Sequence, residues 1–176
     1  RTMAATVDHQ LRIESAGEAQ YVAGICASLG IPHATITPST PITGSIQSAA
    51  RAARYALLKR WAQENGLIAI LTAHHADDQA ETLLMRLNRG AGIGGLAGVR
   101  AVNGPIVRPL LHWRRQELAE IVAHAGIDPV NDPSNTDGRF DRARIRKAIA
   151  ESDWLDPLAM ARSAAAQAES DAALGW

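Results

Sequence analysis

Two clusters of polar side chains have the residue types that could carry out chemistry, and each follows a short apolar run. The first is Asp8-His9 with Arg12, and the second extends from His74 to Glu81. Within the second cluster, Asp78 and Glu81 lie three residues apart near the start of an expected helix, so their carboxylates share one helical face. Together they could bind a cation, such as an amine or a metal ion.

The second cluster also has a simpler explanation, because acidic residues in the first turn of a helix complement its dipole. His74 and His75 argue against that explanation alone, since capping a helix requires neither histidine. Histidines and carboxylates that converge at the end of a strand are typical of a ligand site. We therefore predict that this cluster is functional.

Several arginines could bind phosphate groups. Arg51 and Arg54 lie one turn apart on an expected helix, where paired guanidinium groups could hold phosphate oxygens bidentately. Arg86 and Arg89 have the same spacing on the next helix, and solvated surface arginines would give the same pattern. A further basic run lies around the polar segment 131–135 and consists of Arg139, Arg142, Arg144, Arg146 and Lys147. Such a run is usually a solvated helix face, but beside a polar loop it suits phosphate contacts on RNA.

The glycine-rich segment 90–98 contains the letters of a dinucleotide-binding loop, but it follows a helix instead of opening one after a strand. We therefore reject that interpretation. The glycines could instead let the backbone approach a ligand, form a mobile lid, or make a tight connection.

The expected elements alternate between strands and helices. Strands are predicted at residues 3–7, 33–37, 67–72 and 106–107, and helices at residues 46–65, 77–89, 114–125 and 141–150. A further helix follows the first strand, with Ser15 and Glu18 as its capping box and Gly30 at its end. This order predicts an α/β fold, a parallel sheet with helices on both faces.

Two consequences follow for the arrangement of these elements. The aliphatic run 67–72 should be a central parallel strand that is buried on both faces. Because ligands bind beyond the carboxyl ends of strands in such sheets, the two polar clusters should face one crevice. The alanine-rich tail 157–174 is expected to be helical with little to bury, as in a connecting segment.

Composition narrows the class of protein. A chain of 176 residues with 47% hydrophobic content can form one domain with a continuous core. Its 18 basic and 18 acidic residues balance, so any surface for nucleic acid would have to be local. Cys26 is the one cysteine, which excludes an internal disulfide or a cysteine-based zinc site. No apolar run approaches the ~20 residues of a membrane span, and we expect a cytoplasmic protein.

Taken together, several segments resemble the tRNA(Ile)-lysidine synthetases, a branch of the PP-loop ATP pyrophosphatases. Segment 7–15 resembles the VDHGLR-x-ES motif of that family, and segment 50–55 resembles its AR-x-x-RY helix. The most specific match is the run TAHHADDQAETLLMRLNRGAG at residues 72–92. Arg108-Pro109-Leu110-Leu111 and the segment 132–146 continue in the order of the family.

The resemblance implies an adenine nucleotide alpha hydrolase-like fold, with a parallel sheet, helices on both faces and a helical C-terminal segment. It implies a nucleotide-binding domain at residues 1–126, a basic loop and helix at residues 127–150 that complete the catalytic domain, and an alanine-rich helical linker at residues 151–176. The SGG-x-DS loop of the family should precede the first strand. Since Arg1 leads directly into that strand, we expect the loop to be absent and the chain as given to be inactive. Thr6, Gln10 and Ala91 stand where the family usually has His, Gly and Ser.

The resemblance also implies a two-step ligase reaction. ATP, with Mg²⁺, adenylates C2 of the wobble cytidine in a tRNA(Ile) that carries a CAU anticodon, and pyrophosphate leaves. The ε-amine of free L-lysine then displaces AMP, after a nearby carboxylate has removed its proton. A homodimer would be compatible with this reading, and no membrane partner is expected.

By the same resemblance, the candidate site residues form three groups. The catalytic group contains Asp78, Glu81 and His75. The nucleotide-binding group contains Val7, Asp8, His9, Arg51, Arg54 and His74. The tRNA-binding group contains Arg86, Arg89, Arg108, Arg142 and Arg146. No residue is assigned to a resident metal ion.

Three alternatives remain open at this stage. A tRNA-thiolating enzyme would share the fold, but such enzymes generally use additional cysteines, and Cys26 is alone. A DHH-like metal-dependent phosphohydrolase could use Asp8-His9 with His74, His75 and Asp78 as ligands for Mn²⁺ or Zn²⁺. A non-catalytic RNA-binding module would bind tRNA without turnover.

Overall fold

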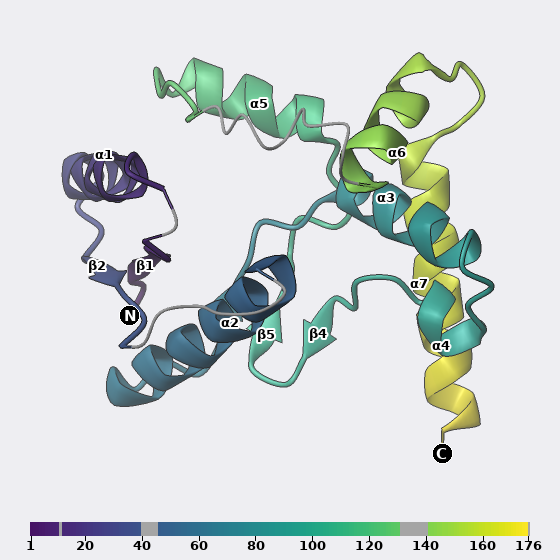
Figure 1. Cartoon of the computed structure of the whole chain (residues 1–176), viewed down its shortest axis with the longest axis horizontal. Coiled ribbons are helices and arrows are strands. Elements are labelled where there is room, and N and C mark those ends of the chain that lie inside the picture. The colour runs from purple at the N-terminus through teal and green to yellow at the C-terminus, as the bar shows by residue number, and fades with distance from the viewer. Residues whose placement is uncertain (11, 40–45, 131–140, 176) are drawn as a thin grey trace. The chain divides into compact units, whose positions relative to one another are not determined.

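The structure is a computed structural model that describes residues 1–10, 12–39, 46–130 and 141–175 of the chain. It consists of two compact units, Arg1–Ile70 and Leu71–Trp176. The boundaries expected from the sequence at residues 126 and 150 do not coincide with this division. Figure 1 shows the helices and strands of both units, which are described separately below.

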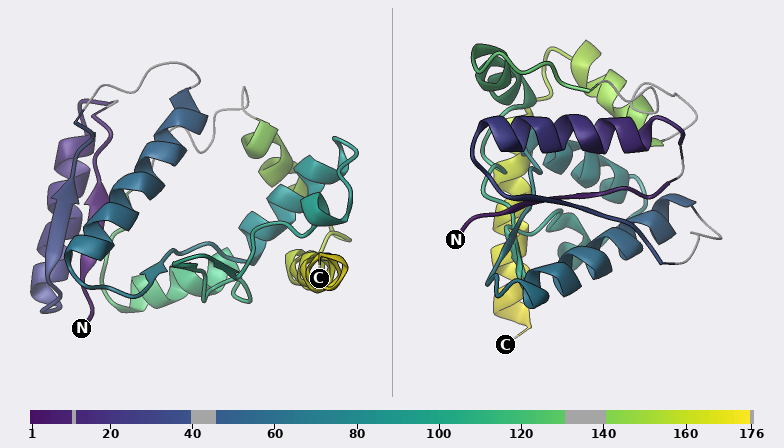
Figure 2. Two further views of the ribbon diagram at one scale, coloured as in Figure 1. Left: turned by 90° about the horizontal axis from the view of Figure 1, so that it is seen from below. Right: turned by 90° about the vertical axis from the view of Figure 1, so that its left-hand side faces the viewer.

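The first unit is built around two parallel strands. Strand β1 (Ala4–Val7) pairs with β2 (His33–Ile36) in the register Ala4↔His33 to Val7↔Ile36. Helix α1 (Ser15–Ser28) connects the strands, and α2 (Ile46–Glu64) follows β2. Both views in Figure 2 show α1 and α2 on opposite sides of the strand pair. The predicted parallel strands with helices on both faces are therefore confirmed.

Helix α1 begins differently from the prediction. Its N-cap residue is Glu14, and no side-chain hydrogen bond caps the helix, so the expected capping box of Ser15 and Glu18 is wrong. The Ser15 hydroxyl donates instead to the carbonyl oxygen of Arg12 at 2.7 Å. Glu18 accepts two hydrogen bonds from the Arg12 guanidinium at 3.0 and 2.9 Å. Both side chains are thus hydrogen-bonded to Arg12 in the loop before the helix. Gly30, with a φ of +67°, ends the helix as predicted.

The second unit is mainly helical. Its helices are α3 (Ala76–Leu87), α4 (Ile93–Leu96), α5 (Arg115–His124), α6 (Asp141–Glu151) and α7 (Pro157–Leu174). Helix α3 packs against both α6 and α7, and α4 also lies against α7 (Figure 1). The core at these contacts is made of small residues, which include Ala76, Ala80, Ala97, Ala161 and Ala164. Small side chains let the helix backbones approach closely.

This packing corrects the prediction for the C-terminal tail. The tail is helical, and the helical C-terminal segment is confirmed, but the expectation that it has little to bury is wrong. Ala164 is fully buried and Ala161 is 6% exposed. An alanine stripe buries too few methyl groups to stand out in a hydrophobicity pattern, although it fits closely against another alanine-rich helix.

A small sheet of three strands completes the second unit, in the order β3-β5-β4. Strands β4 (Val102–Asn103) and β5 (Ile106–Val107) form an antiparallel hairpin, and β3 is limited to Ile70–Leu71. Strand β5 was predicted, whereas β4 was not. The aliphatic run 67–72 is not buried on both faces as predicted, because Ile68 is 97% and Leu71 is 65% exposed. Within the described parts of the chain, no helix is long and apolar enough to cross a membrane.

Candidate functional site

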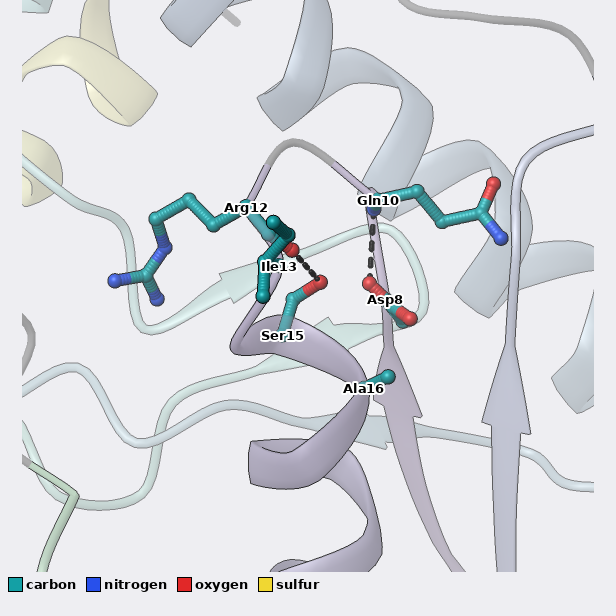
Figure 3. Close-up of a pocket in the computed structure, with 6 residues that line it drawn as sticks. All are labelled: Asp8, Gln10, Arg12, Ile13, Ser15 and Ala16. Atoms are coloured by element: carbon teal, nitrogen blue, oxygen red, sulfur yellow. Dashed lines mark hydrogen bonds between the residues drawn. The ribbon is translucent and has the colours of Figure 1, made fainter.

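In the first unit, the candidate site residues gather where β1 ends. Asp8 continues the strand, because its backbone N–H donates to the carbonyl oxygen of Ile36 at 2.9 Å, and its side chain is buried. An open pocket of about 340 Å³ lies between this strand end and the start of α1 (Figure 3). Its lining residues are Asp8, Gln10, Arg12, Ile13, Ser15 and Ala16.

The Asp8 carboxylate organises this loop. It accepts a hydrogen bond from the backbone N–H of Gln10 at 2.8 Å, which Figure 3 shows as a dashed line. The pKa of Asp8 is lowered mainly because the Ser15 hydroxyl lies close to its carboxylate, and the hydrogen bond from the Gln10 N–H adds to that effect. The pocket is therefore lined by an ionised carboxylate.

Gln10 adopts a backbone conformation that usually requires glycine. Its φ is +55°, the one positive value among non-glycine residues in the described segments. Glycine adopts this conformation without steric cost, so the glycine of the motif that segment 7–15 resembles would fit here. The hydrogen bond to Asp8 holds Gln10 in this conformation despite its side chain.

His9 and Arg54 connect the end of β1 to α2. The Arg54 Nε–H donates to His9 Nε2 at 3.3 Å, across 45 residues of sequence. Burial lowers the pKa of His9 most, the positive charge of Arg54 lowers it further, and Asp8 acts in the opposite direction. The predicted nucleotide-binding residues Val7, Asp8, His9 and Arg54 are thus adjacent in the structure.

The remaining predicted nucleotide-binding residues lie elsewhere. Arg51 points its guanidinium over the ring of Tyr55, 5.2 Å from the ring centre, in a cation–π contact. His74 belongs to the second unit, where its Nδ1 lies 3.0 Å from the hydroxyl of Thr72. The single crevice expected for both polar clusters stays a prediction.

In the second unit, His75 caps α3. Its ring Nδ1 accepts from the backbone N–H of Asp78 at 3.4 Å, and the Asp78 carboxylate accepts from the backbone N–H of His75 at 3.1 Å. The pair is a reciprocal capping box. The sequence argument that capping needs no histidine is therefore wrong at His75, whose imidazole takes the place of the usual Ser or Thr oxygen.

Glu81 is the most enclosed charged group of this cluster, at 2% exposure. Its Oε2 lies 2.7 Å from Arg142 Nε, and its Oε1 lies 2.6 Å from Arg146 Nε. The hydrogen bond to Glu81 raises the pKa of Arg146. Arg142 also reaches Asp78 Oδ1 at 3.4 Å. We call these four residues, Asp78, Glu81, Arg142 and Arg146, the acidic–arginine cluster, and it joins α3 to α6.

Sequence reasoning missed the role of Asp77. Its Oδ2 accepts from the backbone N–H of Arg115 at 2.8 Å, and its Oδ1 lies 3.4 Å from the Arg114 guanidinium. The first-turn carboxylate of α3 therefore also binds the start of α5. Nothing in the sequence marks this contact, because its partners lie 37 and 38 residues away.

The other three predicted tRNA-binding arginines also have partners within the chain. Arg86 donates to the carbonyl oxygens of Gly95 and Gly98 at 2.6 and 3.0 Å. Arg108 is only 6% exposed and donates to the carbonyl oxygen of Arg100 at 2.6 Å. Arg89 is exposed and pairs with Asp141 at 3.1 Å. Arg86 and Arg108 therefore fit a structural role better than a surface contact with RNA.

The glycine-rich segment is held against its own unit. A Cβ at Gly98 would overlap Gln79 Oε1, and a Cβ at Gly94 would lie 2.8 Å from Asp171 Oδ1. Gln79 also exchanges two hydrogen bonds with the backbone of Val99, at 2.6 and 2.8 Å. These contacts support the tight-connection interpretation of the segment, and they do not support a mobile lid.

Some predicted features fall outside the described residues, namely Leu11 of the first motif, the polar segment 131–135 and Arg139. Among the residues that are described, no group of three or more His, Cys, Asp or Glu side chains is arranged to hold a metal ion.

Comparison of the sequence with known proteins identifies the family to which this chain belongs. Residues 1–152 match the family model described as PP-loop domain. The chain is 52% identical over 179 residues to a tRNA(Ile)-lysidine synthase of Novosphingobium aromaticivorans, 44% identical over 182 residues to one of Zymomonas mobilis, and 46% identical over 179 residues to one of Ruegeria pomeroyi. Each alignment covers 98% of this chain, and 55%, 55% and 43% of the relative. The chain thus spans about half the length of the curated relatives it matches.

A solved structure supports the same fold. The U34-tRNA thiolase NcsA from Methanococcus maripaludis, with its 4Fe-4S cluster, matches with a TM-score of 0.77 at 13% identity, over 96% of this chain and 62% of the thiolase. At that identity the likeness concerns the fold alone. Because the family model covers most of the sequence, this chain belongs to the PP-loop domain family.

Proposed function

We propose that this chain carries the catalytic, nucleotide-binding region of a tRNA(Ile)-lysidine synthase. In this reaction ATP adenylates C2 of the wobble cytidine in a tRNA(Ile) with a CAU anticodon, and the ε-amine of free lysine displaces AMP. The observation that carries the proposal is the set of curated relatives of that name. Two of them are 52% and 44% identical to this chain, each over 98% of its length. A cytoplasmic location follows from such a substrate.

The first unit offers a suitable place for ATP. The end of β1 presents polar groups beyond a parallel strand, which is where nucleotides bind in such folds. His9 and Arg54 would contact the nucleotide, since Arg54 is exposed and can carry its fixed positive charge toward phosphate oxygens. Mg²⁺ bound with ATP would neutralise phosphate charge, and no residue of the chain is assigned to it.

The second unit offers a place for the amine. Both oxygens of Glu81 are engaged by arginines, whereas Asp78 is less enclosed, with its side chain 19% exposed. Asp78 is therefore the better candidate to contact the lysine amine and to accept its proton. Glu81 would act by positioning Arg142 and Arg146, which in turn would face the RNA backbone.

The proposal is tested on the full-length natural protein with isoleucine tRNA that carries a CAU anticodon, ATP, Mg²⁺ and isotopically labelled lysine. Mass spectrometry of the nucleosides follows the label into the wobble position. We expect lysine transfer in the wild type and a loss of at least about 100-fold in Asp78→Asn, the lower end for a general base. The matched control is Asp153→Asn, the same chemical change at an exposed aspartate, and it should retain wild-type transfer.

The same assay separates the competing functions. Thiolation would appear as sulfur at the wobble nucleoside, and the single cysteine of the chain, buried Cys26, makes that outcome unexpected. Hydrolysis of phosphoesters that needs Mn²⁺ but no ATP would favour the phosphohydrolase instead. Binding of tRNA with no turnover in the full-length protein would favour a non-catalytic module. Any of these three results would overturn the lysidine proposal.

A further inference from the structure

One nitrogen of the His9 ring makes a hydrogen bond, and the other makes none within the described part of the chain. Nε2 accepts from Arg54 Nε at 3.3 Å. Nδ1 is buried and has no hydrogen-bond partner among the residues that the structure describes. A buried polar nitrogen without a partner is unusual in a folded protein and calls for an explanation.

The bond from Arg54 determines which nitrogen carries the proton. A guanidinium is always protonated and can only donate, so Nε2 must present its lone pair. In the neutral ring the proton then resides on Nδ1. The lowered pKa of His9, caused by burial and by the charge of Arg54, is consistent with a neutral ring, and Asp8 is the charged group that opposes it.

We propose that Arg54 fixes His9 as the Nδ1–H tautomer and that this N–H is a donor reserved for an acceptor atom of the bound adenine nucleotide. The inference rests on the proposed function, because that function identifies the ligand as an adenine nucleotide. It adds a directional role: His9 donates to the ligand and Arg54 positions the donor. Because Nδ1 has almost no accessible surface in the free protein, the groups that cover it must move aside before a nucleotide atom can pair with it.

The direct test is nitrogen-15 NMR of the histidine side chains in the full-length natural protein. The His9 signals, assigned with His9→Gln, should show a protonated Nδ1 and an unprotonated Nε2 in the free protein. Arg54→Met should convert this pattern into a mixture of tautomers. Arg60→Met on the same helix, whose side chain is 78% exposed and pairs with Glu64, should leave it unchanged. A protonated Nε2 in the wild type would overturn the inference, without any need for a variant.

The second test adds the non-hydrolysable analogue α,β-methylene-ATP. We expect the Nδ1–H signal of His9 to move on binding. His9→Ala should weaken the affinity for the analogue by about 3–10-fold, the worth of one hydrogen bond. His9→Asn should restore it, because the Asn amide can donate from nearly the position of Nδ1, whereas His9→Gln should not. An unmoved Nδ1–H signal at saturating analogue would contradict the role of donor.

These results are independent of the proposed reaction. If lysine transfer occurs but His9 carries its proton on Nε2, the further inference fails and the proposed function stands. If His9 has the expected tautomer and responds to the analogue but no lysine is transferred, the donor role stands and the proposed function fails.

Discussion

Arg146 Nε lies 2.6 Å from Glu81 Oε1, and this contact joins α6 to α3 through a carboxylate that is almost fully enclosed. Arg142, one helical turn earlier, occupies the other oxygen. A buried carboxylate with two guanidinium partners is stable only as a complete set, because the loss of one member leaves an uncompensated charge.

Glu81→Ala should therefore lower the free energy of unfolding by about 2 kcal/mol, through the loss of its charged hydrogen bonds to two arginines that stay partly exposed. Urea denaturation followed by circular dichroism measures it. Glu64→Ala is the matched control, since Glu64 pairs with Arg60 on an exposed helix face, and its effect on stability should be much smaller. Equal effects of the two changes would mean that the acidic–arginine cluster contributes no more than a surface pair.

Gly98→Ala should destabilise the protein by at least about 2 kcal/mol, because it combines backbone strain with a steric clash. Its φ is +62°, and the new Cβ would meet Gln79 Oε1. Gly104→Ala is the comparison: its φ is +57°, but no atom lies within 4 Å, so strain alone should cost about 1 kcal/mol. Thermal unfolding of both variants separates the two terms. A smaller loss for Gly98→Ala than for Gly104→Ala would contradict the close packing of this segment.

Gln10→Gly should stabilise the protein, by about 0.5–1 kcal/mol, because glycine adopts a positive φ without the steric cost that a side chain imposes. The gain is smaller than the full steric cost, since glycine also loses more backbone entropy on folding. Gln10→Val, with a β-branched side chain at the same φ of +55°, should be destabilising. Chemical denaturation of the pair measures the difference, and a loss of stability in Gln10→Gly would show that the side chain matters more than the backbone.

The lowered pKa of His9 predicts a pH dependence of stability. Its ordinary value is 6.5, and burial and Arg54 depress it in the folded protein. Between the folded pKa and 6.5 the unfolded chain binds a proton that the folded chain does not, so the free energy of unfolding should fall as the pH drops through this interval. Above 6.5 His9 should contribute no pH dependence. His9→Asn should flatten this part of the curve, and an unchanged slope would mean that other groups cause it.

The sequence was most informative where a pattern is local. The bounds of α7 and the parallel strands β1 and β2 follow from composition, periodicity and the glycines that end helices, and the structure confirms them. The motif residues Asp8, His9 and Arg54 were also expected to act together, and the structure brings them to one strand end.

Contacts between distant residues could not be predicted in this way. Asp77 reaches the start of α5 with no sequence signal, and Glu81 is enclosed by arginines that had been assigned to RNA. The Ser15 and Glu18 capping box failed because Arg12, just before the helix, offers both side chains better partners. Spacing along the chain shows which groups can share a helix face, but burial and tertiary partners decide which of them remain free for a ligand.

The close approach of Gly98 to Ala164 has a consequence for how the protein is made. A Cβ at Gly98 would lie 3.3 Å from the Ala164 side chain, so α7 forms part of the surface on which the glycine-rich segment rests. During synthesis on the ribosome, the described elements of the first unit all emerge before residue 71. The second unit must wait for α7 before its alanine core can close, so α3 remains partly uncovered while the intervening residues are translated.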